Sequence, residues 1–430
     1  MLETIIKPRV ILFKKIIPVI LVLIMVTIVG GWLTGSYSGL KFGSWQIAEW
    51  LINYQSGFIR RGLIGQLLYS YGDGQNLLYL LYWFTFLCYA LYCTIFLAIY
   101  FLAKIESPKV LLIALLIPGG ILPMGMTMQF FNRKEILFLI LFGILCLHYL
   151  WLQRASPKWR TFWICSMYAF AICGGISMML IHEGYLFMGY PLTVLLMWLV
   201  YRENSQKFLI AAMSFIYIVV IPILFIYCAQ HKGDASSAQI IWDSLSLSDR
   251  VALSKAAPYT AFGPIASLGW GMTQHLLTIY GVYEAGGWIY WLLFFVGNSL
   301  ILIYLGLNLE VVIKNRYGIV APVWYLRILM LGFVISLAMF VIAADWGRWI
   351  AFVSNASILL AFTLTASPSA RKPLSVNISA NKSVLSKVAF ALTSSYVLVA
   401  ILLYAFTLKL PECCVSSNLI WFPYGLIFSN

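Results

Sequence analysis

The chain has 430 residues, of which 62% are hydrophobic, 16% aromatic and only 10% charged. This composition, with a mean hydropathy of +0.92, is typical of a polytopic membrane protein and excludes a water-soluble globular domain. The formal net charge is +14. In a soluble protein such an excess would suggest a nucleic-acid partner, but here Lys and Arg gathered in cytoplasmic loops explain it, so no nucleic acid is expected.

The apolar runs come first in chain order. About 20 apolar residues are needed to cross the hydrocarbon core. The first run follows a basic start and lacks a small-residue cleavage site, so we expect a retained helix rather than a signal peptide. These runs predict an all-α fold with a single transmembrane domain over residues 1–430. The eleven predicted spans are 14–35, 76–103, 110–131, 136–153, 161–181, 184–201, 208–229, 287–309, 326–344, 349–366 and 388–408.

The third of these runs is irregular. Pro118, Gly119, Gly120, Pro123 and Gly125 interrupt it. A broken helix is tolerated at membrane depth only where protein or a hydrated cavity satisfies the freed backbone groups. We therefore expect either protein groups or a hydrated cavity to satisfy the backbone of this run.

The distribution of charge predicts the orientation. With the N-terminus in the cytoplasm, 18 of the 28 basic residues but only four of the 14 acidic residues fall on the cytoplasmic side. This bias agrees with the positive-inside rule and predicts a multi-pass membrane protein with its C-terminus outside. The two longest connections, residues 36–75 and 230–286, then both lie outside. We expect the functional site there.

Cysteines and short motifs narrow the chemistry. The eight cysteines include no CxxC pair, which argues against a disulfide framework and a metal site. The chain contains no phosphate-binding GxxxxGK[ST], no dinucleotide-binding GxGxxG, no HExxH and no nucleophile elbow. We expect neither a cofactor nor a metal.

Four charged clusters lie at the ends of apolar runs, all on the predicted external side. Ionisable groups at membrane depth are costly unless they are paired or hydrated, so each cluster is a candidate functional site. The clusters are Arg60 with Arg61, Arg133 with Lys134 and Glu135, His182 with Glu183, and Asp345 with Arg348.

The first cluster belongs to the first external loop. Residues 42–53 alternate apolar and polar side chains, which predicts an amphipathic helix in the membrane interface that carries Glu49. The segment GFIRRGLIGQLLY follows. Its glycines would let a ligand approach the backbone. The planar guanidinium groups of Arg60 and Arg61 can each bind two oxygens, which suits a diphosphate. The alternative is a pair of arginines that anchor the chain to lipid headgroups.

The second and third clusters each allow two interpretations. Arg133 and Lys134 could hold another anionic group oriented by Glu135. Alternatively, Glu135 could simply complement the N-terminus of the following helix. His182 or Glu183 could act as a general base if burial brings its pKa toward neutrality. Otherwise the two residues form a polar turn between helices.

The fourth cluster is Asp345 and Arg348, three residues apart. On a helix this spacing places both side chains on one face, where they can pair. Trp346 and Trp349 flank them, as in an interfacial aromatic belt or a surface that stacks on sugar rings. Asp345 competes with Glu49 and Glu183 as the carboxylate that activates an acceptor hydroxyl, and a simple ion pair is the alternative.

The whole-chain architecture resembles bacterial polysaccharide polymerases of the O-antigen and capsule type and the C-superfamily of lipid-dependent glycosyltransferases. The resemblance implies a polyprenyl phosphate or diphosphate donor, with cationic residues at the phosphate and a carboxylate or histidine at the acceptor. For phosphate binding it implies Arg60, Arg61, Arg133, Lys134 and Arg348, and for catalysis Glu49, His182, Glu183 and Asp345. The acid pair usual in the first external loop of the transferases is missing, since only Glu49 and the distant Asp73 are available there. This departure favours a metal-independent polymerase.

The expected function is therefore an inverting glycosyl transfer that assembles surface polysaccharide. Its partners would be a polyprenyl-linked sugar donor, a glycan acceptor and membrane lipids. The alternatives are a polytopic transporter, a flippase for lipid-linked oligosaccharides, or a non-catalytic subunit of such a pathway. Transporters tend to place charged sites near the bilayer midplane and to contain inverted repeats, neither of which this sequence indicates.

Overall fold

The protein is an all-α, polytopic membrane protein. Its computed structural model describes residues 44–105, 107–126, 133–284, 286–317, 345–366, 395–408 and 410–411. Seven helices in these ranges are long and apolar enough to cross a membrane. They are α4 (Leu77–Leu102), α8 (Glu135–Leu152), α9 (Pro157–Ile181), α10 (Tyr185–Glu203), α11 (Lys207–Gln230), α16 (Gly287–Tyr317) and α18 (Trp346–Thr365).

The remaining predicted spans divide into two groups. The predicted spans 110–131 and 388–408 coincide with shorter apolar helices, α5 (Pro108–Leu116) with α6 (Ile121–Met126), and α20 (Ser395–Thr407). The predicted spans 14–35 and 326–344 lie outside the described residues.

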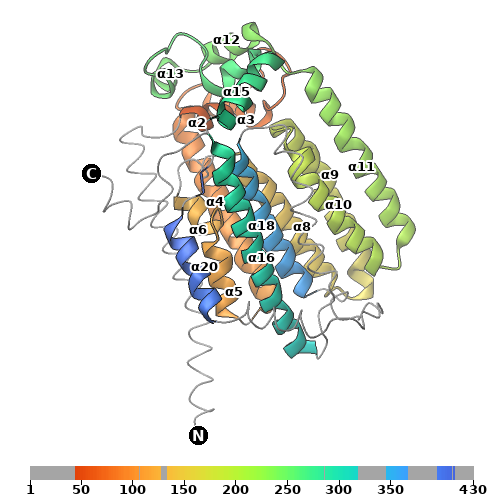
Figure 1. Cartoon of the computed structure of the whole chain (residues 1–430). Coiled ribbons are helices and arrows are strands. Elements are labelled where there is room, and N and C mark those ends of the chain that lie inside the picture. The colour runs from red at the N-terminus through yellow and green to blue at the C-terminus, as the bar shows by residue number, and fades with distance from the viewer. Residues whose placement is uncertain are drawn as a thin grey trace.

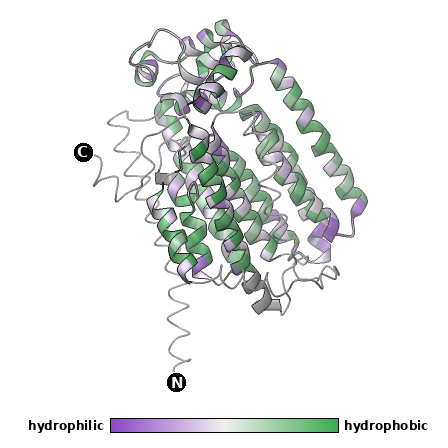
Figure 2. Cartoon of the chain, viewed as in Figure 1, coloured by the Kyte–Doolittle hydropathy of each residue, from purple (hydrophilic) through white to green (hydrophobic). Residues whose placement is uncertain are grey.

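The long helices run side by side as a bundle (Figure 1). Helices α8 and α18 are its centre, since both are buried along most of their length, whereas α11 lies at one edge and buries few residues. On α11, Phe208 and Phe215 are exposed, as expected for side chains that face lipid. Apolar residues cover the helices, and hydrophilic residues gather at helix ends (Figure 2).

The break predicted in the third run is present between α5 and α6. Asn298 of α16 donates through Nδ2 to the carbonyl of Pro118 at 2.8 Å, and Asn355 of α18 donates to the carbonyl of Gly119 at 2.7 Å. Gly119 has φ +73°, and a Cβ there would meet Ala351 at 2.8 Å. Two buried amides thus satisfy the carbonyls that the break frees, as the sequence predicted.

A layer of short helices covers one end of the bundle. We call it the cap and define it as α12 (Ala235–Ser244), α13 (Leu247–Leu253), α14 (Gly263–Ala266), a 3₁₀ turn η1 (Ser267–Gly269) and α15 (Met272–Glu284). It lies above α2 (Ser44–Trp50) and α3 (Leu63–Gly72) (Figure 1). Asp249 fastens the cap to the bundle, because its Oδ2 accepts from the backbone N–H of Leu77 at 3.2 Å, in the first turn of α4.

The amphipathic helix predicted in the first long connection is present as α2, but the prediction that its apolar face packs against lipid is wrong. Ile47 and Trp50 are fully buried, and the helix packs between α4 and the cap helices α13 and α14. The apolar face packs against protein instead of lipid because the cap covers this end of the bundle. Glu49 is therefore also buried, with 3% of its surface exposed.

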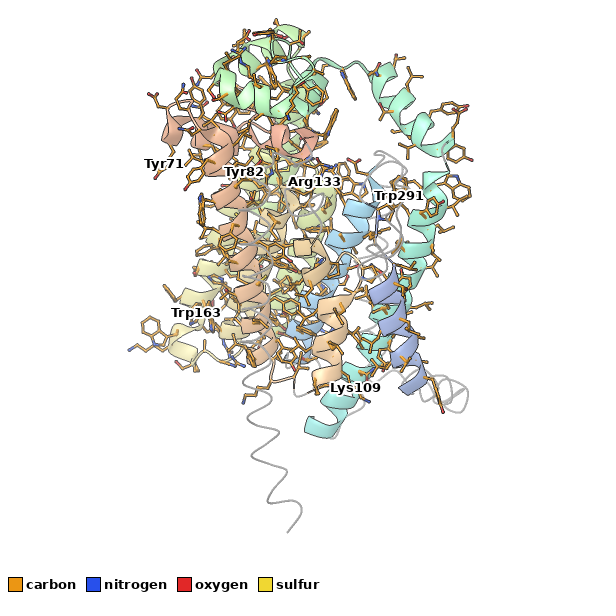
Figure 3. The ribbon with its side chains drawn as sticks, turned by 90° about the vertical axis from the view of Figure 1, so that its left-hand side faces the viewer. Tyr71, Tyr82, Lys109, Arg133, Trp163 and Trp291 are labelled. Atoms are coloured by element: carbon orange, nitrogen blue, oxygen red, sulfur yellow. The ribbon has the colours of Figure 1, made fainter. Side chains whose placement is uncertain are left out.

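The second charged cluster lies at one end of the bundle. Arg133 lies at the cap end, together with Tyr82, whereas Lys109 and Trp163 lie at the opposite end (Figure 3). Residues on the two predicted sides of the membrane thus occur at opposite ends of the described helices.

Candidate functional site

Ionisable side chains from all four sequence clusters meet beneath the cap. They come from the first loop, the start of α8, the connection between α9 and α10, and the start of α18. Each is joined to others by an ion pair or a hydrogen bond, and together we call them the charge network. It consists of Glu49, Arg60, Arg61, Arg133, Lys134, Glu135, His182, Glu183, Asp345 and Arg348.

Glu183 binds the two arginines of the first cluster. Its Oε1 accepts from Arg60 Nη1 at 3.1 Å, and its Oε2 accepts from Arg61 Nε at 2.8 Å. Burial opposes ionisation of Glu183, but the positive charges of Arg61 and Arg60 hold the pKa of its carboxyl well below the usual value. Glu183 is therefore a carboxylate whose two oxygens are both engaged.

Glu49 is the hub of the charge network. Its Oε1 lies 3.2 Å from His182 Nε2 and 3.5 Å from Arg61 Nη1, while its Oε2 lies 3.3 Å from Arg133 Nη1 and 3.9 Å from Arg348 Nη1. Burial opposes ionisation, yet the hydrogen bond with His182 and the neighbouring positive charges keep the pKa of Glu49 well below its usual value. Glu49 is placed to hold the cations in position.

His182 uses both ring nitrogens within the protein. Its Nδ1 lies 2.9 Å from the backbone N–H of Gly184 and can only accept there, which assigns the ring proton to Nε2, next to Glu49. With this neutral histidine, five cationic side chains face four carboxylates. The charge network therefore carries one surplus positive charge.

Lys134 supports the loop rather than a carboxylate. Its buried Nζ donates to the carbonyls of Arg61 at 3.0 Å and Ile181 at 3.2 Å. Burial lowers the pKa of Lys134 to about 8. Arg61 has φ +69°, a left-handed conformation that is uncommon and strained for a residue other than glycine. Lys134 thus holds in place the backbone that aims Arg61 at Glu183.

The predicted pair of Asp345 and Arg348 is confirmed. Arg348 Nη2 donates to Asp345 Oδ2, and Arg348 Nη1 lies 3.0 Å from Oε1 of Glu135. The guanidinium also stacks 4.8 Å from the ring centroid of Trp349. Trp349 is buried, so neither the predicted aromatic belt nor stacking on a sugar applies to it. Trp349 instead packs inside the protein against the charged guanidinium of Arg348.

Several buried polar atoms of the charge network have no hydrogen-bond partner among the described residues. They are Nε of Arg60, Nε and Nη1 of Arg348, and both carboxylate oxygens of Glu135. The contact between Arg348 and Glu135 is an ion pair without hydrogen-bond geometry. A buried polar group left without a hydrogen bond costs about 1–3 kcal/mol. These donors and acceptors are the places where a ligand would be held.

The glycines of the first cluster serve the protein's own packing. A Cβ on Gly65 would lie 1.9 Å from the carbonyl oxygen of Ile52, and one on Gly62 would lie 2.2 Å from the ring of Tyr54. The prediction that these two glycines admit a ligand is wrong, because the chain itself fills the space beside them. Gly57, in contrast, has φ +96°, and a Cβ there would meet no atom within 4 Å.

The two long connections, which were predicted to lie outside, contribute differently. The first supplies Glu49, Arg60 and Arg61, whereas the second supplies a backbone contact, from the N–H of Arg60 to the carbonyl of His231 at 2.9 Å. Carboxylates of the cap bind partners in the cap or in the bundle. Asp243, for example, pairs with Arg250 at 2.8 Å. Among the described residues, no cluster of three or more His, Cys, Asp or Glu side chains suits a metal ion.

Sequence reasoning understated Glu135. The residue opens α8, so it was expected to orient a neighbouring cation or to complement the helix N-terminus. The sequence does contain a feature that points to Glu135 as a site residue. Its carboxylate comes directly after two cations and before an uninterrupted apolar span. Such a carboxylate enters the membrane domain and needs a partner from another helix.

No curated protein and no solved structure matches this chain. The family described as "Uncharacterised membrane protein Rv1490" matches residues 18–237, just over half of the chain. The matched part contains Glu49 and three of the four charged clusters, and it ends before Asp345 and Arg348. The chain therefore belongs to this family of membrane proteins.

Proposed function

We propose that the chain is an integral membrane glycosyltransferase of the polysaccharide-polymerase type. It would assemble surface polysaccharide from polyprenyl-phosphate-linked or polyprenyl-diphosphate-linked sugars at the external face of the bacterial inner membrane. One observation carries the proposal: a cationic network with unpartnered buried guanidinium N–H groups lies at one end of an apolar bundle.

Arg60 is the best candidate for the phosphate. Its Nη1 is bound to Glu183, but its buried Nε has no acceptor among the described residues. A guanidinium that binds a phosphate oxygen makes a charge-assisted hydrogen bond, about twice as strong as a neutral one. The surplus of one positive charge matches a phosphodiester with a single negative charge more closely than a diphosphate. Arg61 and Lys134 would hold the frame that positions Arg60.

The chemistry would be largely electrostatic. In an inverting transfer the acceptor oxygen bonds to the anomeric carbon, and the bond from that carbon to the phosphate oxygen breaks and leaves its electron pair on the phosphate. Fixed positive charge near the departing phosphate stabilises the transition state. Removal of one such donor lowers turnover by about 10²–10³. Arg60 would supply this charge without reorganisation, since its ion pair with Glu183 already fixes it.

The surroundings suit a lipid-linked substrate. The bundle beneath the charge network is apolar (Figure 2). Helix α15 exposes Leu276, Leu277, Tyr280 and Tyr283, which fits a helix at a membrane surface. A polyprenyl chain would remain in the hydrocarbon while its phosphate reached the cap end.

The test is made in cells that lack the chain and are complemented with wild-type protein or with Arg60→Gln. Loss of the chain is expected to abolish one surface polysaccharide and to let its lipid-linked sugar precursor accumulate on the external leaflet. Arg60→Gln is expected to restore at most about 1% of the polymer on the turnover scale of a lost donor. Unchanged polymer and precursor in the deletion strain would overturn the proposal.

The same experiment distinguishes the proposed transferase from a flippase. If the chain were a flippase, the lipid-linked precursor would accumulate on the cytoplasmic leaflet, where an impermeant periodate reagent cannot oxidise its sugars in intact cells. The position of the charge network at one end of the bundle favours the transferase, because transporters tend to bind substrate near the midplane.

A further inference from the structure

Glu135 differs from the other carboxylates of the charge network. It is buried, with 5% of its surface exposed, and begins α8 beside Arg348. Neither of its oxygens accepts a hydrogen bond from any described residue, and its one ion pair is with Arg348 Nη1 at 3.0 Å. A carboxylate has about four lone-pair sites, so most of its accepting capacity is unused.

The other three carboxylates are engaged or hydrated. Both oxygens of Glu49 and both oxygens of Glu183 contact cationic side chains or the His182 ring. Asp345 is bound to Arg348 and has 22% of its side chain exposed, so water can reach it. Glu135 alone among the four combines burial with unused acceptors.

We propose that Glu135 binds the acceptor hydroxyl and takes its proton during glycosyl transfer. The inference rests on the proposed function and deepens it. The acceptor O–H bond breaks and its proton passes to Glu135, the oxygen bonds to the anomeric carbon, and the departing phosphate keeps the electron pair of the broken C–O bond. Arg348 assists, because its unpartnered Nε can donate to another oxygen of the acceptor.

The connectivity of the charge network fits this division. An inverting transfer needs the attacking hydroxyl and the departing phosphate on opposite faces of the anomeric carbon. Arg60, whose Nε has no acceptor, and Glu135, whose oxygens accept no hydrogen bond from a described residue, stand at opposite ends of a continuous series of ion pairs. The series runs from Arg60 through Glu183, Arg61, Glu49 and Arg348 to Glu135.

The test compares Glu135→Gln with Glu203→Gln as a matched control. Glu203 accepts hydrogen bonds from Tyr149 and Gln153, both at 2.6 Å, and belongs to the end of α10 remote from the cap. Two quantities are measured: surface polymer in complemented cells, and binding of undecaprenyl phosphate to the purified protein in lipid nanodiscs. For Glu135→Gln, polymer is expected to fall about 10²-fold or more, as for loss of a general base, with undecaprenyl phosphate affinity within about threefold of wild type.

Glu135→Asp separates chemistry from structure. It keeps the carboxylate, so it is expected to restore part of the polymer lost in Glu135→Gln while unfolding at the same temperature as that variant. Wild-type polymer yield in Glu135→Gln would overturn the inference and leave the proposed function standing. Parallel loss of phosphate binding, polymer and thermal stability in both variants would also overturn it, by assigning Glu135 a structural role. Failure of the proposed function is distinct, because deletion of the whole chain would then leave the polymer unchanged.

Discussion

Arg61 and Glu183 are 122 residues apart in the sequence, yet Arg61 Nε donates to both carboxylate oxygens of Glu183, at 3.0 and 2.8 Å. The pair joins the first external loop to the connection between α9 and α10. It also fixes the carboxylate that binds Arg60.

Arg61→Gln and Glu183→Gln are each expected to destabilise the protein, and the double variant less than the sum. A single substitution leaves a partner charge uncompensated, while the double substitution leaves two amides that can bind each other. The coupling is expected to be about 1–3 kcal/mol in the free energy of unfolding. Unfolding in mixed micelles, followed by tryptophan fluorescence, measures it. Additive losses would show that the two side chains act independently.

Lys134 is expected to make stability depend on pH. Its pKa is about 8 in the folded protein against an ordinary value of 10.5, so the unfolded chain binds more protons between these limits. The free energy of unfolding should therefore rise with pH from about 8 to 10.5, with a slope of at most about 1.4 kcal/mol per pH unit from this group. Lys134→Met should remove that component of the slope, whereas Lys109→Met, exposed at the opposite end, should retain it. Equal slopes in wild type and Lys134→Met would contradict the assignment.

Asp249 is expected to hold the cap on the bundle. Asn76 precedes α4 without a side-chain capping bond, and Asp249 supplies the acceptor from α13. Asp249→Ala should destabilise the protein by about 1 kcal/mol, as for a lost N-cap, and speed proteolysis within the cap. The matched control is Asp243→Ala, whose exposed pair with Arg250 is worth about 0–1 kcal/mol. Similar proteolysis of the two variants would show that Asp249 does not fasten the cap.

Gly65 is expected to tolerate no side chain, because a Cβ would lie 1.9 Å from a backbone oxygen that cannot move aside. Gly65→Ala should lower the melting temperature strongly. Gly281→Ala, in α15, should be neutral or stabilising by up to about 1 kcal/mol, because a Cβ there would meet no atom within 4 Å. If Gly65→Ala instead melted like wild type but bound undecaprenyl phosphate more weakly, the glycine would serve ligand approach and the packing explanation would be wrong.

Length and hydropathy predicted much of the fold. The expected spans 76–103 and 208–229 match α4 and α11 to within two residues, because the hydrocarbon core imposes a minimum apolar length on any helix that crosses it. The sequence did not predict the short helices of the cap. These helices are held in place by packing on α2 and by tertiary contacts such as that between Asp249 and the start of α4. No local sequence pattern encodes such contacts.

The sequence predicted which residues form the candidate site but not which of them contact one another. Charge bias placed all four clusters on one side, and the structure brings them together. The pairing of carboxylates with arginines depends on how the helices pack. The spacing of Asp345 and Arg348 therefore predicted only the pair between these two neighbours in the sequence. The roles of Glu49 as hub and Glu135 as unused acceptor follow from contacts between elements, and neither is visible in sequence.

The central claim is that the charge network binds a lipid-linked phosphate through Arg60. The most direct measurement is the affinity of the purified protein in lipid nanodiscs for undecaprenyl phosphate, by native mass spectrometry. The matched control is Arg250→Gln, since Arg250 also pairs with one carboxylate and has an unpartnered Nε, but belongs to the cap. We predict that Arg60→Gln weakens binding by about tenfold or more, the equivalent of one charge-assisted hydrogen bond of about 1.5–3 kcal/mol, while Arg250→Gln stays within about threefold of wild type. Equal affinity of wild type and Arg60→Gln, or no binding by wild type above empty nanodiscs, would contradict the claim.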